Sequence, residues 1–207
     1  MQRNGDAPIE YVVFDLGGVL IDWNPRYLYR QLLPDHAVEP FVRDVVHATW
    51  NAQMDAGVPF ADALDERVRA YPDHAGLIRA YWDRWAEMLG GALEGTVDVL
   101  RELRDAEVPV YALTNWSAET FHHATDRFDF LSWFRDIVVS GRERVVKPDP
   151  AIYRLLLDRN DLDPTRGVFV DDVPKNVDGA RRVGLDAVRF EDPASLRGDL
   201  RRRGLPV

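Results

Sequence analysis

The sequence contains no cysteine. This absence excludes disulfides, thiolate metal sites and a cysteine nucleophile, and it fits a cytoplasmic location. No hydrophobic run reaches the roughly 20 apolar residues that a membrane-spanning helix requires. The N-terminal segment carries acidic side chains instead of the apolar stretch of a signal peptide. We therefore expect a cytoplasmic protein that does not act at a membrane.

Basic side chains are fewer than acidic ones, since 26 Lys and Arg stand against 35 Asp and Glu, and the formal net charge is −9. Duplex binding needs a basic surface that displaces counterions, so nucleic acid is not an expected partner. The basic cluster Arg201–Arg203 is better explained as a solvated helix end, where cations complement the helix dipole. The 207 residues, 46% hydrophobic and 29% charged, suit one globular core domain with a modest insertion.

Short apolar runs without alternation predict strands that are buried on both faces of a sheet. The runs cover 11–14, 108–113, 137–139, 167–170 and 186–190. Helical patterns separate them at 93–107, 148–159 and 174–183, with Gly184 as a C-cap, and Ser117 is typical of the start of a further helix. This alternation predicts an α/β chain with a doubly wound parallel sheet, that is, a Rossmann-like core.

Residues 24–91 interrupt the alternation, because they are helix-like and include no convincing strand. Asn24-Pro25 is typical of a helix start. We interpret 23–91 as an α-helical cap inserted after the first strand, and 1–22 with 92–207 as the catalytic core. Trp82 and Trp85 are expected in the core of the cap. Trp50-Asn51 and Met54-Asp55 are candidates to face a substrate, although packing in the core of the cap explains Trp50 and Met54 equally well.

Polar residues of complementary type follow four of the predicted strands. Ligands of parallel sheets bind at the carboxyl ends of the strands. A single acidic residue there usually caps a helix or turn, but an ordered set of such residues is not expected by chance. Three carboxylates repel one another unless a cation lies between them, and an all-oxygen set suits Mg²⁺. The set consists of Asp15, Thr114, Asn115, Lys147, Asp171 and Asp172.

These residues stand in motifs that resemble the four ordered motifs of the haloacid dehalogenase superfamily. The resemblance covers the chain from Tyr11 to about Phe190 and places the cap where α-helical-cap members carry it. The opening motif most resembles that of sugar-phosphate phosphatases of the α-D-glucose-1-phosphate phosphatase type. The four motifs are Phe14-Asp15-Leu16-Gly17-Gly18-Val19-Leu20, Leu113-Thr114-Asn115, Lys147-Pro148, and Val170-Asp171-Asp172 with Asn176.

The resemblance implies a phosphatase in which Asp15 is the nucleophile and forms an aspartyl-phosphate. Magnesium would be held by Asp15, the backbone carbonyl of Gly17 and Asp172, with Asp171 beside it as a further ligand or through water. The expected substrate is a small phosphorylated metabolite, a sugar phosphate being one candidate, and the expected assembly is a monomer or a homodimer.

The remaining motif residues would bind the phosphoryl group. Thr114 and the Asn115 amide would hold phosphate oxygens, and Lys147 would neutralise charge on the nucleophile and on the transferring group. Asn176 would orient Asp171 or Lys147. Trp116, which directly follows the phosphate-binding pair, is a further candidate to contact the substrate.

One position departs from the family pattern. Most of the family's phosphatases carry a second aspartate two residues after the nucleophile, and this chain has Gly17 there. General acid–base catalysis is commonly worth about 10²–10⁴-fold. Either the leaving group needs little protonation, as in an anomeric sugar 1-phosphate or an acyl phosphate, or a nearby acid substitutes. Asp22 is the nearest candidate in sequence.

The same departure leaves two alternatives open. Haloacid dehalogenases also lack the second aspartate, but they act on carbon without a metal and do not carry the paired acids Asp171-Asp172. A weakly active or inactive member that only binds phosphate is the second alternative, and Gly17 alone favours it.

We predict that the protein releases phosphate from phosphate monoesters only when Mg²⁺ is present, because the clustered carboxylates need a cation. Phosphate and halide release are measured in parallel, with and without EDTA, on phosphate monoesters and on 2-haloacids. Halide release that survives chelation would contradict the phosphatase interpretation.

Overall fold

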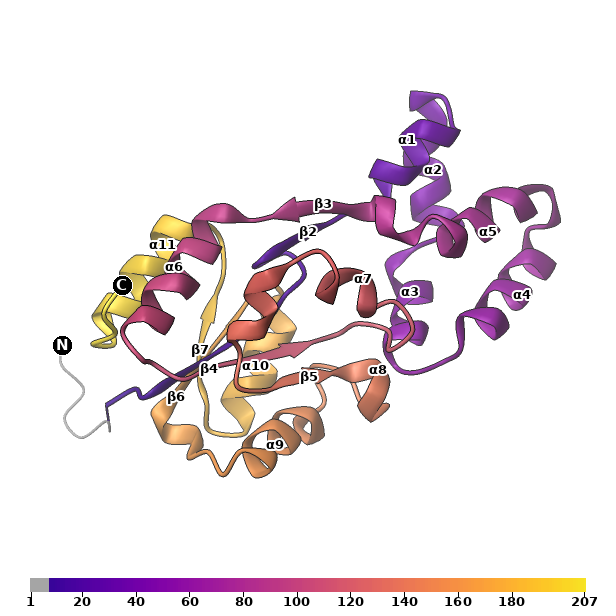
Figure 1. Cartoon of the computed structure of the whole chain (residues 1–207). Helices are drawn as coiled ribbons and strands as arrows, with labels where there is room; N and C mark the ends of the chain where they lie inside the picture. The colour runs from indigo at the N-terminus through magenta and orange to yellow at the C-terminus, as the bar shows by residue number, and fades with distance from the viewer. Residues whose placement is uncertain (1–7) are drawn as a thin grey trace.

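The computed structural model describes residues 8–207, and at its centre five parallel strands form one sheet in the order β5-β4-β1-β6-β7 (Figure 1). β1 is the central strand and pairs in parallel with β4 and β6. All five strands were expected from the apolar runs. They are β1 (Tyr11–Phe14), β4 (Val110–Thr114), β5 (Ile137–Val139), β6 (Gly167–Asp171) and β7 (Asp186–Arg189).

Both faces of the sheet are covered, which explains why its strands are apolar without alternation. Tyr11 and Val13 of β1 pack in the hydrophobic cluster under helices α9 (Pro150–Arg159) and α10 (Pro174–Arg182). Val12 and Phe14 pack in the other cluster, with α6 (Glu94–Asp105) and α11 (Pro193–Arg202). The doubly wound parallel sheet of the Rossmann-like core is confirmed.

The segment after β1 forms helices that are grouped at one end of the molecule (Figure 1). The helices are α1 (Arg26–Leu32), α2 (Asp35–Asp44), α3 (Ala48–Asp55), α4 (Phe60–Ala70) and α5 (Ala75–Asp83), with 3₁₀ turns at Pro72–His74 and Trp85–Met88. Their buried aromatic side chains pack together, with Trp50 edge-on against Tyr81 and both at most 2% exposed, and they belong to the same hydrophobic cluster as Val12 and Phe14 of β1. The expected boundaries of the cap, 23–91, and of the core remain a prediction.

Two local expectations about this segment were wrong. A two-stranded antiparallel ribbon joins it to the sheet, formed by β2 (Ile21–Trp23) and β3 (Leu89–Ala92). β3 is short and contains two glycines, so its strand character comes from pairing with β2 and not from local propensity. Trp82 is 37% exposed, whereas Trp85 is buried as expected.

A third difference concerns the segment after β4. Ser117 does not start a helix: its hydroxyl accepts a hydrogen bond from the Glu119 N–H within a turn, and α7 (His122–Thr125) begins five residues later. The side-chain oxygen thus satisfies a local turn, a common alternative to a helix cap. The expectation for Gly184 holds, since it follows α10 with φ of 93°. The 3₁₀ turns at Asp129–Trp133 and Pro164–Arg166 complete the connections.

The carboxyl ends of β4 and β5 are held together by a close backbone contact. Gly141, in α8 (Ser140–Glu143), donates its N–H to the Trp116 carbonyl at 3.0 Å. A Cβ at Gly141 would lie 2.4 Å from the Ala118 nitrogen and 2.8 Å from the Trp116 oxygen, both backbone atoms. Only glycine therefore fits without a shift of the chain.

Within residues 8–207, no helix combines the length and the apolar character that crossing a bilayer requires.

We predict that Gly141→Ala lowers the free energy of unfolding by about 1–3 kcal/mol, because the added methyl group collides with backbone. Gly76→Ala in α5 is the matched control, since a Cβ there meets nothing within 4 Å and alanine favours a helix by up to about 1 kcal/mol. Urea unfolding of the two variants gives the comparison. If the two substitutions changed the free energy of unfolding by the same amount, the close backbone contact at Gly141 would be absent.

Candidate active site

A buried lysine links two of the predicted carboxylates. Asp15 directly follows β1, Asp171 is the last residue of β6, and Lys147 lies between α8 and α9. The Lys147 Nζ lies 2.8 Å from Asp15 Oδ2 and 2.7 Å from Asp171 Oδ2. The side chains of Lys147 and Asp171 have no exposed surface, and that of Asp15 is 10% exposed. Charges buried this far require partners of opposite sign.

Asp172 adds a third carboxylate. One ligand oxygen from each of Asp15, Asp171 and Asp172 can be chosen so that all lie within 4.8 Å of one another. Asp172 also lies against the loop after β1, where a Cβ at Gly18 would be 2.9 Å from Asp172 Oδ2. Gly18 has φ of 78°, so this turn needs glycine for its conformation and for the space. Lys147 alone does not neutralise three carboxylates, and an oxygen cluster of this kind could hold a metal ion.

The pKa values reflect this excess of negative charge. Burial raises the pKa of Asp15, Lys147 opposes this rise, and the charges of Asp171 and Asp172 add to it, so that the resulting pKa is about 7. Burial and the charge of Asp171 also raise the pKa of Asp172. For Lys147, burial lowers the pKa, but the two carboxylates outweigh it and the net direction is upward. The site thus keeps the Lys147 ammonium group charged and disfavours the ionised forms of Asp15 and Asp172.

Asp171 has most of its hydrogen-bonding capacity filled by protein groups. Asn176, in α10, donates through Nδ2 to both Asp171 oxygens at 3.0 and 3.1 Å, and the Val173 N–H donates to Oδ1 at 2.8 Å. With Lys147 on Oδ2, each oxygen has two donors. Asp15 accepts from Lys147 on Oδ2 and from the Leu16 N–H on Oδ1. Asp15 and Asp172 therefore have more free lone pairs for a ligand than Asp171.

Asn115 fixes the backbone of Lys147. Its Oδ1 accepts the Lys147 N–H at 2.8 Å, and its Nδ2 donates to the Lys147 carbonyl at 3.0 Å. This reciprocal pair engages the side-chain amide, so the backbone N–H of Asn115 is the group through which it could reach a phosphate. Thr114, the last residue of β4, is buried beside it.

Trp116 lies in an aromatic cluster. It is 5% exposed, its ring centroid is 5.5 Å from that of Trp85 and 5.7 Å from that of Phe121, and its Nε1 donates to the Thr120 hydroxyl. These contacts join the end of β4 to the segment before β3. A substrate contact by Trp116 stays a prediction.

Asp22, the expected substitute acid, lies in the β2–β3 ribbon. Its Oδ2 accepts a hydrogen bond from the Tyr27 hydroxyl at 2.5 Å, and a Cβ at the facing Gly90 would be 2.3 Å from that same oxygen. By contrast, Asp55 at the end of α3 lies close enough to Asp15 and Lys147 for their charges to shift its pKa. Sequence reasoning gave Asp55 no catalytic role, because only the packing of α3 on the core brings it there.

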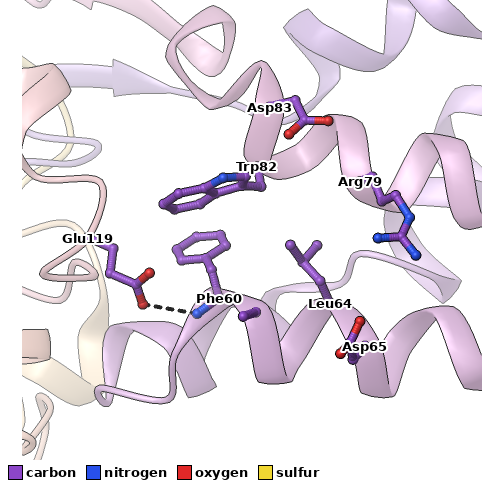
Figure 2. A pocket seen from close by; sticks show the side chains of 8 residues that line it. Phe60, Leu64, Asp65, Arg79, Trp82, Asp83 and Glu119 are labelled. Atoms are coloured by element: carbon purple, nitrogen blue, oxygen red, sulfur yellow. Dashed lines mark hydrogen bonds between the residues drawn. The ribbon is translucent and has the colours of Figure 1, made fainter.

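A surface hollow of about 380 Å³ lies between α4 and α5, and its lining includes Phe60, Leu64, Trp82 and Glu119 (Figure 2). None of the predicted site residues lines it, so it is not the site formed by the strand ends. Figure 2 shows instead how this region is fastened: Glu119, which follows β4, accepts the Phe60 N–H at 2.9 Å where α4 begins.

Several known proteins are similar to this chain. The sesquiterpene phosphatase astK of Aspergillus oryzae is 29% identical over 191 residues, which cover 91% of this chain and 93% of that protein. The phosphorylated carbohydrates phosphatase of Thermotoga maritima is 22% identical over 182 residues, covering 87% of this chain and 84% of that protein.

Solved structures share the fold. A magnesium complex of a HAD family enzyme from Bacteroides thetaiotaomicron superposes with a TM-score of 0.71 at 21% identity, covering 92% of this chain and 99% of that one. A dehalogenase superposes with a TM-score of 0.68 at 20% identity, covering 89% and 85%. The family model described as haloacid dehalogenase-like hydrolase matches residues 9–184. The chain is therefore a hydrolase and belongs to the haloacid dehalogenase-like family.

Proposed function

We propose that the protein is a Mg²⁺-dependent phosphatase that hydrolyses a small phosphate monoester through an aspartyl-phosphate on Asp15. The observation that carries the proposal is the cluster of three carboxylates that surrounds the fully buried Lys147 at the carboxyl ends of β1 and β6. The two relatives named above are phosphatases by name. A sugar phosphate is one candidate substrate, in keeping with the name of the Thermotoga relative.

The donor set fits magnesium. Hard oxygen ligands suit this ion, and the raised pKa values of Asp15 and Asp172 indicate a site that a further positive charge would stabilise. Asp15, Asp172 and the Gly17 carbonyl would hold the ion. Asp171 would lie beside it, since its oxygens already accept hydrogen bonds from Lys147, Asn176 and Val173. When bound, the ion would neutralise the carboxylates and the phosphoryl oxygens.

The chemistry assigned to this chain's residues has two steps. An Asp15 carboxylate oxygen attacks phosphorus while the bond from phosphorus to the leaving oxygen breaks, and the leaving oxygen takes a proton from an acid in the site or from water. Water then attacks the phosphorus of the aspartyl-phosphate and regenerates Asp15. Lys147, the Thr114 hydroxyl and the backbone N–H of Asn115 would hold the phosphoryl oxygens in both steps, which is the positioning and charge stabilisation that phosphoryl transfer needs.

The helical segment 23–91 would act as the cap that selects the substrate. Dehalogenases share the fold, but at this level of identity the likeness concerns fold alone. A carbon-directed reaction gives no role to Asp172, whose half-buried negative charge next to Asp15 and Asp171 would then lack compensation. The cluster therefore favours phosphate over 2-haloacids.

We predict that Asp15→Asn abolishes Mg²⁺-dependent hydrolysis of p-nitrophenyl phosphate, with a loss on the order of 10³-fold or more, because an amide is not a nucleophile. The substitution removes one buried negative charge, so thermal stability should not fall. Asp158→Asn, at an exposed position of α9, serves as the control and should keep full activity. Equal rates for wild type and Asp15→Asn would end the nucleophile assignment.

A second prediction concerns pH. The pKa of Asp15 is about 7 in the folded, metal-free protein against about 4 when unfolded. Its contribution to stability is thus full below about pH 4 and is lost as the pH rises through about 7. Magnesium replaces the lost proton, so Mg²⁺ should raise Tm more at about pH 8 than at about pH 5.

The measurement is Tm with and without Mg²⁺ at both pH values, for wild type and for Asp15→Asn. We expect the pH dependence of the magnesium shift to weaken in the variant. A magnesium shift that is the same at both pH values in the wild type would contradict binding at Asp15.

A further inference from the structure

The end of α3 is tied to the carboxyl ends of two core strands. Asp55 is the last residue of α3, and its carbonyl accepts a hydrogen bond from the Ser140 hydroxyl at 2.6 Å. The same hydroxyl accepts the Trp116 N–H at 3.0 Å. Ser140 directly follows β5, is fully buried, and so connects Asp55 to the segment that follows Thr114 and Asn115.

The residues that follow Asp55 are fastened to the same region. A Cβ at Gly57 would lie 3.1 Å from the Gly141 carbonyl oxygen and 3.0 Å from the Arg144 Cγ, so the loop after α3 lies directly on α8. Gly57 has φ of 93°, a conformation that favours glycine. Three residues on, the Glu119 carboxylate accepts the Phe60 N–H (Figure 2). Three separate contacts therefore fix where Asp55 stands relative to the core.

The Asp55 carboxyl group itself is oriented from both sides. Asn51, one turn earlier in α3, donates through Nδ2 to Asp55 Oδ2 at 2.9 Å, and its Oδ1 accepts the Tyr81 hydroxyl at 2.7 Å. Tyr81, in α5, is fully buried and its ring packs on Trp50. From the core side, the Ser117 backbone N–H lies close enough to the Asp55 carboxyl group to lower its pKa. The group therefore faces the strand end that carries Thr114 and Asn115.

The protonation state of Asp55 suits proton donation. Burial and the charge of Asp15 raise the pKa of Asp55, the Ser117 N–H, Lys147 and Asn51 lower it, and the resulting pKa is about 8. Tyr81, Arg144 and Glu119 are further ionisable groups that lie against this segment. At neutral pH, Asp55 is mainly a protonated carboxylic acid, and a general acid works best with a pKa near the working pH.

There is open space at Gly17, the position where most of the family's phosphatases carry the acid–base aspartate. A Cβ at Gly17 would meet nothing within 4 Å. Asp22 is engaged by Tyr27 in the ribbon. Asp55 therefore combines a fixed position over the strand ends, electrostatic coupling to Asp15 and Lys147, and an available proton.

We propose that Asp55, supplied by α3, is the general acid and base that Gly17 cannot provide, which makes the enzyme competent for leaving groups that need a proton. As Asp15 attacks phosphorus and the bond to the leaving oxygen breaks, the Asp55 proton passes to that oxygen and Asp55 becomes a carboxylate. Asp55 then takes a proton from the water that attacks the aspartyl-phosphate. Asp15 leaves as a carboxylate, and Asp55 is again protonated. The proposal rests on the proposed phosphatase function and deepens it.

The test compares two substrates of nearly equal shape, phenyl phosphate and p-nitrophenyl phosphate, in the full-length protein with Mg²⁺. Phenolate is a poor leaving group and needs the proton, whereas p-nitrophenolate does not. We expect Asp55→Asn to lower kcat/KM for phenyl phosphate by about 10²–10⁴-fold and for p-nitrophenyl phosphate by less than about 10-fold. With phenyl phosphate, the wild-type kcat/KM should fall above about pH 8, and this decline should be absent in Asp55→Asn.

A rescue variant separates catalysis from structure. Because the space at Gly17 is open, Gly17→Asp in the Asp55→Asn background should restore much of the phenyl phosphate activity, which no repair of α3 packing would explain. Asp62→Asn, an exposed change in the neighbouring helix α4, is the matched control and should alter neither substrate.

The outcomes are distinct. If the wild type hydrolyses neither substrate with Mg²⁺, the proposed function itself fails. If the wild type is active and Asp55→Asn lowers kcat/KM equally for both substrates, or for neither, Asp55 is not the general acid. The proposed phosphatase function then stands and only the role of Asp55 is overturned. If instead Asp22→Asn lowers kcat/KM for phenyl phosphate selectively, Asp22 is the general acid and the assignment of Asp55 is overturned.

Discussion

Lys147 brings an ammonium group to 2.8 Å from Asp15 and 2.7 Å from Asp171, at a position where its side chain has no exposed surface. Without either carboxylate, the ammonium charge would be left unpaired in a medium of low polarity, which is costly. The surrounding structure is arranged to hold this contact. Asn115 fixes the lysine backbone, and Asn176 and the Val173 N–H fix Asp171. The ends of β1 and β6 thus meet at one ammonium group, and the residue after β4 fixes the backbone that carries it.

The same arrangement leaves the site short of positive charge. Burial and repulsion outweigh the effect of Lys147 and raise the pKa of Asp15 to about 7, so without a cation the proposed nucleophile is only partly ionised near neutral pH. A cation at Asp15 and Asp172 would favour the ionised nucleophile and would also attract phosphate. The packing of three carboxylates beside a single lysine therefore supports the proposed magnesium site.

Most of the core could be predicted from the sequence, because its signals are local. The five apolar runs predicted the five strands, and Asp15, Lys147, Asp171 and Asp172 followed from their places at strand ends. The β2–β3 ribbon was missed, since Gly90 and Gly91 have little strand propensity and only pairing with β2 orders them. Asp55 was not recognised as an acid, because its position depends on Ser140, Gly141 and Glu119, far away in sequence.

The most direct test of Asp15 as the nucleophile is acid-quenched peptide mass spectrometry during turnover of a phosphate monoester with Mg²⁺. If Asp15 forms an aspartyl-phosphate, the peptide that contains Asp15 carries a hydroxylamine-sensitive phosphoryl group, and the same peptide of Asp15→Asn carries none. Turnover without a phosphoryl group at Asp15, or with one on another residue, would contradict it.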